Sequence, residues 1–386
     1  MRILHTSDWH LGRQFHGASM LTHQATFLDH LIATVEEQAV DLVVIAGDVF
    51  DRALPPVDAV ALADDAFARL AASRARVVAI SGNHDSAIRL GLNARLIDAA
   101  GLHLRTDPAR VDDPVLLADD QGPVAVYAIP FLEPDLLREA WDLPARSHHA
   151  ALSAAVARIR ADLAGRGEGV RAVVLAHAFV AGGAPSDSER DIAVGGVAVV
   201  PPELFDGFSY TALGHLHGRA TLSPTVRYSG SPLAYSFSEA QHTKGSWLID
   251  LDADGVCADR FLPAPVPRAL ARLSGEIEDL LSAPRYAAHE SAWLQITLTD
   301  AIRPAQAMTR LQRRFPHVVA LQFRPDGVEP PAPVAVEGRS DLDIALDFVG
   351  AVRGTPADAA ERVVLAEACE ACAREPDADP VARVGA

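Results

Sequence analysis

Short apolar runs alternate with longer stretches of helical periodicity over the first two thirds of the chain. Five of the runs predict buried strands, and they are Ile3–Leu4, Leu42–Ile45, Val77–Ile80, Val173–Ala176 and Thr211–Leu213. Three of the longer stretches have helix-like patterns, and they are Ala25–Glu37, Val57–Ser73 and Ala151–Leu163. This alternation predicts an α/β domain, which we expect to cover residues 1–262.

Two proline-rich segments divide the rest of the chain. The first, Leu262–Pro267, contains three prolines and predicts a stiff boundary. Between it and the second segment, Arg324–Gly338, we expect a small α+β domain over residues 268–325. Its strands are predicted at Trp293–Leu298 and Val318–Phe323, on either side of a helix at Arg303–Phe315.

A pair of short helices is predicted in residues 339–375. Ser340 can cap the first helix, and Thr355 can cap the second with Pro356 at its first position. Each helix is too short to be stable alone in water, and each has an apolar face. We therefore expect the pair to bind a groove or a coiled coil of another protein. The alternative is that the two helices fold back on the small domain.

Side chains that can bind metals follow each of the five predicted strands. They are Asp8, His10, Asp48, Asn83, His84, His177, His215 and His217. The carboxyl ends of parallel strands form the edge where α/β sheets place their active sites. A mixture of Asp, Asn and His suits two divalent cations such as manganese.

The spacing within these clusters suggests separate roles. Asp48 follows a strand and a glycine, so it is the natural bridge between two ions. Asp8 and His10 are two residues apart, and on an extended segment both would face one ion. His84 would point elsewhere and would be available for proton transfer, with Asp85 orienting its ring.

Each cluster by itself also fits an ordinary role. A Gly-Asp pair is usually a turn, and His177 alone would more often be an interior or surface histidine. The metal-site hypothesis depends on the conjunction of five clusters, in order, each after a predicted strand.

Composition narrows the class of protein. The net charge of −17 argues against a chain that grips nucleic acid unaided, although metals or a partner could supply positive charge. Three cysteines give no disulfide framework and indicate the cytoplasm. No apolar stretch reaches the length of a membrane span.

The clusters resemble the calcineurin-like metallophosphoesterase superfamily. The matching strings are Asp8-Trp9-His10, Gly47-Asp48-Val49-Phe50-Asp51, Gly82-Asn83-His84-Asp85, His177 and Gly214-His215-Leu216-His217. Longer strings are similar to the SbcD family of bacterial nuclease subunits, namely Thr6 to Gly12, Ser81 to Ser86, Ser186 to Arg190, Arg227 to Pro232 and Tyr235 to Ala240. One departure is Gly218-Arg219-Ala220, which leaves the ligand positions intact.

The resemblance implies a fold and a set of roles. The fold would be a β-sandwich flanked by helices, with a small capping domain that binds DNA and a C-terminal helix pair. One manganese would be held by Asp8, His10, Asp48 and His217, and the other by Asp48, Asn83, His177 and His215. His84 would be the catalytic histidine.

The resemblance also implies partners and substrates. The partner would be SbcC, an ATPase with a long coiled coil, bound by the helix pair. The complex would act in DNA repair, recombination and replication by cutting double-stranded DNA from its ends and by opening hairpins and single strands. The family further implies a homodimer within a heterotetramer, formed through helices at Val57–Ser73 and Leu90–Ala100.

Two other functions compete with this hypothesis. A phosphodiesterase acting on small phosphoesters would keep the metal ligands but would not need the small domain or the helix pair. A scaffold with a dead site would lack ligands, and none is missing here. Among the remaining features, we expect Ser186–Arg190 to form a rim near the substrate, His148-His149 a solvated loop, and the pair Cys369 and Cys372 an inert helix face.

Overall fold

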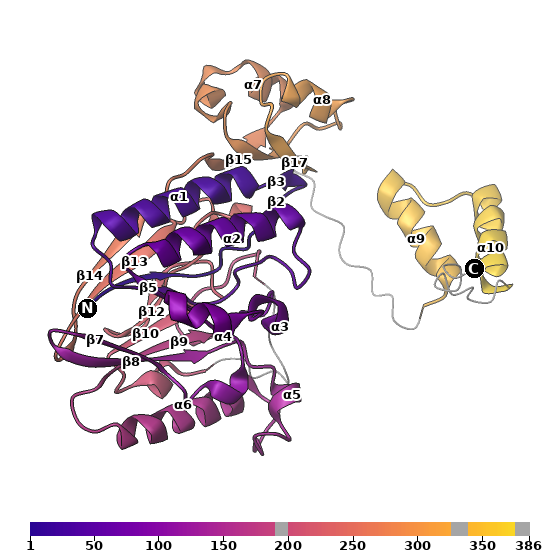
Figure 1. Ribbon diagram of the computed structural model, residues 1–386. Coiled ribbons are helices and arrows are strands. Elements are labelled where there is room, and N and C mark those ends of the chain that lie inside the picture. Colours follow the sequence, from indigo (N-terminus) through magenta and orange to yellow (C-terminus); the bar gives the residue numbers. More distant parts are fainter. Residues whose placement is uncertain (190–199, 326–338, 375–386) are drawn as a thin grey trace. The chain divides into compact units, whose positions relative to one another are not determined.

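Two units make up the computed structural model, Met1–Phe323 and Arg324–Ala386, and each is described by itself. The structure describes residues 1–189, 200–325 and 339–374 (Figure 1). Within these ranges no helix is both long enough and apolar enough to cross a lipid bilayer.

Most of the first unit is built on two six-stranded sheets. The first has the spatial order β14 (Gly255–Pro263), β13 (Gly245–Asp252), β1 (Arg2–Thr6), β4 (Leu42–Ile45), β5 (Arg76–Ile80) and β6 (Leu102–Arg105). The second has the order β11 (Ala220–Thr221), β12 (Val226–Tyr228), β10 (Tyr210–Gly214), β9 (Arg171–His177), β8 (Gly122–Ile129) and β7 (Val115–Asp119). Four neighbouring strands run parallel in each sheet, so their carboxyl ends lie along one edge.

Helices and short segments connect these strands. The helices are α1 (Leu21–Glu37), α2 (Val57–Ala72), α3 (Ala87–Leu90), α4 (Ala94–Ile97), α5 (Pro134–Leu137) and α6 (His148–Gly165). The 3-10 turns are η1 (Asp98–Ala100), η2 (Pro108–Arg110), η3 (Pro202–Phe205) and η4 (Phe237–Glu239). A small hairpin joins β2 (Gln14–Phe15) and β3 (Ala18–Ser19).

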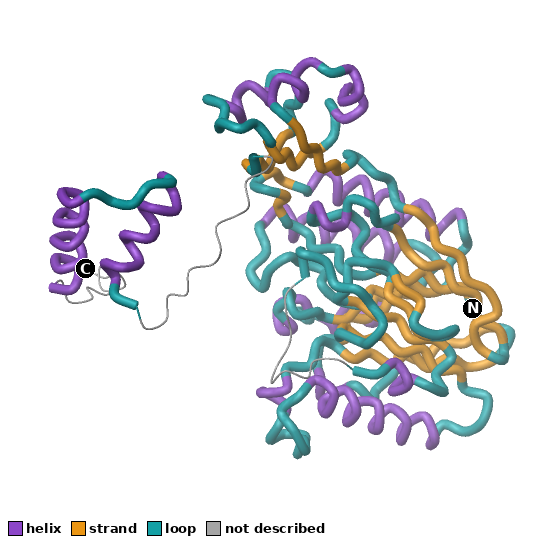
Figure 2. Tube along the Cα trace, turned by 180° about the vertical axis from the view of Figure 1, so that it is seen from behind, coloured by secondary structure: helices purple, strands orange, loops and turns teal. Residues whose placement is uncertain are grey.

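The alternation of side chains along the strands builds three cores. Ile3 and Val44 of the first sheet pack in one buried cluster with Val126 and Leu175 of the second, so the sheets form a sandwich. The outer face of the first sheet is covered by α1 and α2, and the outer face of the second by α6. Figure 1 shows these helices on opposite sides of the strands, and Figure 2 shows the same arrangement from behind. The predicted helix-flanked β-sandwich is confirmed.

Several predicted helix boundaries were wrong. Helix α1 begins at Leu21 rather than Ala25, because Gln24 is polar yet buried and therefore hides the apolar pattern. The helix expected at Leu90–Ala100 is three short pieces, interrupted at Gly91 and at Asn93, which has a left-handed φ of 62°.

The start of α6 also differs from the prediction. His148 and His149 open this helix instead of forming a solvated loop, with the Ser147 side chain accepting a hydrogen bond from the Ala150 amide. The His148 side chain is buried and lies against the ring of Phe131.

The last part of the first unit is a small α+β module. Its parallel sheet has the order β15 (Leu270–Gly275), β16 (Trp293–Leu298) and β17 (Val318–Phe323), and its helical segments are α7 (Ile277–Ser282), η5 (Pro284–His289) and α8 (Ala307–Gln312). Helix α8 is shorter than predicted because Gln306 has a left-handed φ of 51°. An aromatic cluster joins the module to the sandwich, with Trp293 stacked on Phe15 at 4.9 Å between ring centroids.

The second unit contains α9 (Asp341–Arg353) and α10 (Ala359–Arg374). Ser340 caps α9 as predicted, since its side chain accepts a hydrogen bond from the Asp343 amide. Thr355 does not cap α10. Asp358 takes that position in a reciprocal pair, in which its carboxylate accepts from the Glu361 amide and its own amide donates to the Glu361 carboxylate.

Candidate metal centre

Five loops that follow β1, β4, β5, β9 and β10 meet at one edge of the sandwich and bring the predicted site residues together. Ligand atoms lie within 4.8 Å of one another in three groups, which are Asp8 with His10 and His217, His10 with Asp48 and His84, and Asp8 with Asp48 and His177. Asn83 joins the same cluster through its side-chain oxygen, which lies 2.9 Å from His177 Nε2 and 3.2 Å from His215 Nδ1. All eight predicted side chains therefore gather in one place.

Asp48 lies at the middle of this cluster. Its Oδ2 atom is 3.5 Å from His10 Nε2 and 3.5 Å from His177 Nε2. On the His10 side, His217 Nε2 lies 3.0 Å from His10 Nε2. One carboxylate oxygen thus stands between two sets of nitrogen and oxygen donors, as a ligand shared by two cations would.

The backbone of these loops is unusual. Asp8, His10, Asp48 and His215 have φ values of 54°, 46°, 52° and 106°. Left-handed residues other than glycine are uncommon and typically concentrate at functional sites. Asp8 and His10 do reach the same cluster, but not on the extended segment predicted from their spacing.

Backbone pairing holds the first two loops in place. The Asp8 amide donates to the Gly47 carbonyl at 3.0 Å, and the His10 amide donates to the Asp48 carbonyl at 3.0 Å. Gly47 has a φ of 92°, and a Cβ atom there would collide with the His177 ring. A larger residue at this position would therefore push the His177 imidazole out of the cluster.

Burial controls the protonation of the cluster. Burial lowers the pKa of His177 and His217 to about 4 and puts the pKa values of His10 and His215 well below their usual range. Burial and the neighbouring charge of Asp48 raise the pKa of Asp8 well above its usual range. These imidazoles are therefore neutral at pH 7, which is the form that binds metals.

The donor set fits divalent cations. Neutral imidazoles, a carboxamide oxygen and buried carboxylates provide many lone pairs and no positive charge of their own. Taking carboxylates out of water is unfavourable unless a cation compensates them. Carboxylate oxygens with imidazole nitrogens suit manganese, and they also suit zinc or iron.

His84 has a distinct environment. Its amide donates to Asp48 Oδ1 at 2.8 Å, and its Nδ1 atom lies 2.8 Å from the backbone carbonyl of Asp51. Because a carbonyl only accepts, Nδ1 carries the proton and Nε2 is the acceptor nitrogen. The prediction that Asp85 orients this ring was wrong, since the Asp85 carboxylate accepts from the amides of Gly82, Val49 and Phe50.

Several residues of the site were missed by the sequence analysis. Gln24 donates to the His10 carbonyl at 2.7 Å, and Arg13 binds both Asp51 and the Ser188 carbonyl. Ser188 is buried against His217 rather than lying on a rim, and Arg190 is outside the described residues. Glu239 and Lys244 form a buried ion pair behind the same histidine.

Little in the sequence could have revealed these contacts. Tyr235–Ala240 carries a family string, but no local pattern assigns its glutamate to a histidine 22 residues away. Gln24 lies one residue before the predicted helix Ala25–Glu37, where a polar residue is ordinarily solvated.

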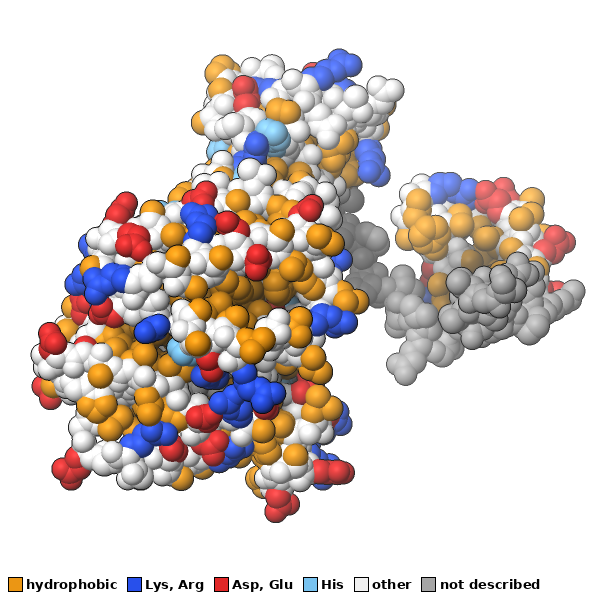
Figure 3. All heavy atoms as spheres, viewed as in Figure 1, with side chains coloured by type: hydrophobic (Ala, Val, Ile, Leu, Met, Phe, Trp, Pro, Cys, Tyr) orange, Lys and Arg blue, Asp and Glu red, His pale blue; other side chains and the backbone are white. Residues whose placement is uncertain are grey.

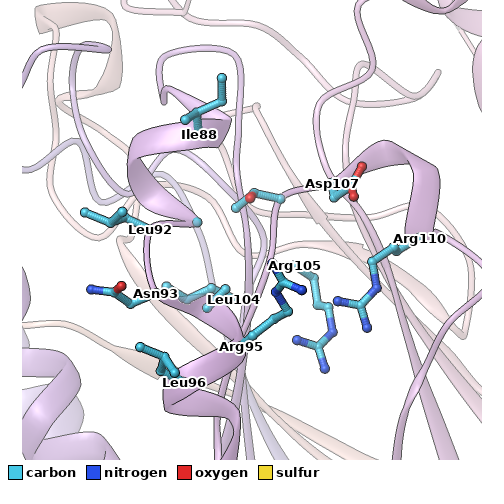
Figure 4. A pocket seen from close by; sticks show the side chains of 12 residues that line it. Ile88, Leu92, Asn93, Arg95, Leu96, Leu104, Arg105, Asp107 and Arg110 are labelled. Carbon is cyan, nitrogen blue, oxygen red and sulfur yellow. The ribbon is translucent and has the colours of Figure 1, made fainter.

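A hollow lined by other residues of the first unit has different chemistry. It measures about 930 Å³ and is lined by α3, α4, β6 and η2, with Arg95, Arg105 and Arg110 around it (Figure 4). Arg105 is paired with Asp98, and Arg110 is paired with Asp113. Much of its positive charge is therefore compensated, and its lining includes none of the eight predicted site residues.

Two family models match the chain. Residues 1–131 match the calcineurin-like phosphoesterase model, and residues 266–349 match SbcD_C, the type 5 capsule protein repressor C-terminal domain. The first match contains the loops with Asp8, His10, Asp48, Asn83 and His84. The second contains the small α+β module and most of α9.

Three solved structures are similar at low identity. The protein TT1561 of Thermus thermophilus is 16% identical, with 67% of this chain and 98% of that chain covered and a TM-score of 0.38. A novel archaeal phosphodiesterase is 13% identical, with 68% and 100% covered and a TM-score of 0.29. GAP50, the anchor in the inner membrane complex of Plasmodium, is 12% identical, with 85% and 98% covered and a TM-score of 0.39. These TM-scores are too low to support any functional argument.

The two family matches agree with the fold and with the cluster of carboxylates and imidazoles. The chain therefore carries a calcineurin-like metallophosphoesterase domain and an SbcD_C domain, and this combination supports an SbcD-like nuclease subunit.

Proposed function

We propose that the chain hydrolyses DNA phosphodiester bonds with two divalent metal ions, with manganese as the expected metal. The observation that carries this proposal is the position of Asp48 Oδ2, which is 3.5 Å from a donor nitrogen on each side. A cluster of this kind binds a pair of cations rather than one.

Each ion has its own ligands in this proposal. The first is held by Asp8, His10, Asp48 and His217, which is supported by the grouping of Asp8, His10 and His217. The second is held by Asp48, Asn83, His177 and His215, which is supported by the contacts of the Asn83 oxygen with both histidines.

The chemistry is divided between the ions and the chain. When bound, two such ions neutralise the phosphodiester and lower the pKa of a water molecule. His84 lies next to them, with its ring centroid 4.6 Å from that of His10. Held by the Asp51 carbonyl, it presents Nε2, where a proton can be exchanged with the reacting oxygens.

The partner surfaces lie outside the metal cluster. Helices α9 and α10 expose Phe348, Val352, Val363 and Val364, each more than half accessible, and no α9 residue is buried. We propose that this pair binds the coiled coil of an SbcC-type ATPase. Duplex ends would then be cut in an ATP-dependent manner.

A second apolar surface supports self-association. A hollow of about 710 Å³ lies among α2, α3 and α4, and Figure 3 shows hydrophobic side chains gathered on this face. Leu54 and Leu92 in its lining are 67% and 69% exposed. We propose that two copies pair through this surface, within a heterotetramer that includes two ATPase subunits.

The small module is proposed to cap the DNA. Two of its arginines are already compensated, because Arg310 is paired with Glu278 and Arg314 with Glu290. We expect the protein to work in the cytoplasm in DNA repair, recombination and replication.

One experiment separates this function from hydrolysis of small phosphoesters. The purified chain is incubated with Mn²⁺ and labelled hairpin, single-stranded or blunt duplex DNA, with and without the ATPase partner and ATP. We expect hairpin and single-strand cleavage by the complex, and duplex end cutting that requires ATP. Turnover of bis-p-nitrophenyl phosphate with no cleavage of any DNA, even with the partner, would support the small-molecule alternative.

A further inference from the structure

A buried ion pair lies behind His217. Glu239 is fully buried and Lys244 is nearly so, with Lys244 Nζ 2.5 Å from Glu239 Oε2. Burying two charges is unfavourable unless further hydrogen bonds satisfy them. A carboxylate and an ammonium at this depth therefore need an explanation.

Both oxygens of the Glu239 carboxylate accept several hydrogen bonds. Oε1 accepts from the hydroxyls of Ser186 and Ser236 at 3.1 Å each, and also from the Ser188 hydroxyl. Oε2 accepts from the Tyr235 amide at 3.2 Å and from Lys244. Each of these groups donates to the carboxylate, and one of them is the ammonium of Lys244, so the geometry is that of an ionised carboxylate.

This ionised carboxylate sets the direction of a short relay. His217 Nδ1 lies 2.5 Å from Ser188 Oγ, and Ser188 Oγ contacts Glu239 Oε1. A carboxylate only accepts, so Ser188 must donate its hydroxyl proton to Glu239. Ser188 Oγ then accepts from His217 Nδ1–H, which leaves the lone pair of His217 on Nε2.

The backbone of His217 is held by Lys244 and by Glu189. Lys244 Nζ donates to the His217 carbonyl at 2.7 Å, and the His217 amide donates to Glu189 Oε1 at 2.6 Å. The amide, the carbonyl and the ring of this histidine are therefore all anchored. By contrast, the Nδ1 atom of His177 rests on a neutral group, the Ala46 carbonyl.

We propose that Glu239 is a positioning residue that, held by Lys244 and acting through Ser188, presents Nε2 of His217 to the metal beside His10. Outer partners of this kind fix the tautomer and orientation of a histidine ligand. The proposal rests on the proposed function for the role of His217 as a ligand. The hydrogen-bond relay that sets the tautomer needs no metal.

Three full-length variants test the proposal. Ser188→Ala removes the relay and leaves the ion pair. Glu239→Gln with Lys244→Met removes both charges, so neither is left buried alone. Asp119→Asn is the matched control, because it also disrupts an ion pair with a buried residue, Arg171. Arg171 begins β9 and His177 ends it, so this ion pair lies at the end of the strand away from the site.

The first readout is calorimetric titration with Mn²⁺. We expect both relay variants to lose about 10- to 100-fold in affinity at one of two sites and to keep the other. Their cleavage activity should recover at high Mn²⁺. The Asp119→Asn control should melt at a lower temperature with both affinities unchanged. Wild-type affinity at both sites in folded relay variants would overturn the proposal.

The second readout is ring ¹⁵N NMR of His217 in the metal-free protein. The wild type should show the Nδ1–H tautomer, and Ser188→Ala should shift the ring towards a mixture of tautomers. An unchanged tautomer in both relay variants overturns the positioning role. Failure of the wild type to bind Mn²⁺ or to cleave any phosphodiester would instead remove the proposed function, while the NMR result would still decide the tautomer.

Discussion

The edge of the sandwich where the five candidate metal-binding loops meet differs from the α9–α10 pair in how it is built and in how much of it is buried. The edge is assembled from five loops that are far apart in the sequence. Seven of its eight candidate site residues are buried, and four of the eight have a left-handed backbone. The helix pair is held by local capping contacts, and its large apolar residues are exposed. The first region can act only when the whole sandwich is folded, whereas the second leaves its large apolar residues exposed for the partner proposed above.

Removing Asp48, the proposed bridging ligand, should impair metal binding in the first region most severely. Asp48→Ala should weaken Mn²⁺ binding at both sites by more than about 100-fold, since even indirect partners of ligands cost about 10- to 100-fold. Asn83→Ala should weaken mainly one site. Calorimetric titration distinguishes the two variants, and equal effects on both sites in the two variants would count against Asp48 as the bridge.

His84→Ala separates catalysis from metal binding. We expect cleavage to fall by about 10²- to 10⁴-fold, the usual contribution of a proton-transfer group, with two Mn²⁺ ions still bound. His84 lies in a group with His10 and Asp48, so the alternative is that it is a ligand. Loss of a metal together with activity would establish that alternative.

Deletion of residues 339–386 tests the second region. Mn²⁺ binding and basal cleavage of short single strands should remain nearly intact, because no predicted site residue lies in that unit. Association with the ATPase and ATP-dependent cutting of duplex ends should be lost. Co-purification of the truncated chain with the partner at full affinity would show that another surface makes the contact.

A pH titration contrasts the two regions without touching a ligand. His5 bridges the sheets, with Nδ1 2.8 Å from the Tyr210 hydroxyl and Nε2 3.1 Å from the Leu213 carbonyl, and burial lowers its pKa to about 3. Its folded pKa lies below its unfolded value of about 6.5. The stabilising contribution is therefore present above pH 6.5 and is lost as the pH falls towards 3.

The measurement compares wild type with His5→Gln at the same metal concentration. As the pH is lowered from 6.5 to 4, the melting temperature of the first unit should fall less steeply in the variant than in the wild type. The second unit contains no histidine, so its helical content should not change through histidine titration over this range. Identical slopes for wild type and variant would mean that His5 is not neutral in the folded protein.

The smallest expected effect is at a helix cap. Ser340→Ala removes the bond to the Asp343 amide and should destabilise α9 by about 1 kcal/mol. Circular dichroism of the full chain should show earlier loss of helix, with unchanged Mn²⁺ affinity. A change in metal binding would mean that the two regions are coupled.

The sequence by itself determined the strands and the identity of the candidate ligands. Runs such as Leu42–Ile45 and Val77–Ile80 are buried strands in the structure. They could be predicted because a short apolar run is a local feature of the sequence. Asp48 and His177 could be named in advance because His177 directly follows such a run and Asp48 comes three residues after the end of one. The N-cap at Ser340 could also be predicted from the sequence, because a capping side chain acts within one helical turn.

Only the tertiary structure decided how the site is supported. Asp8 and His10 share a cluster through left-handed backbone rather than through an extended segment. His148 looked solvated but is buried, and Asp51 rather than Asp85 holds the His84 ring. Glu239 meets Ser188 from 51 residues away. Such contacts depend on how distant loops pack at one edge of the sandwich, and no local pattern of hydrophobic and polar residues encodes that packing.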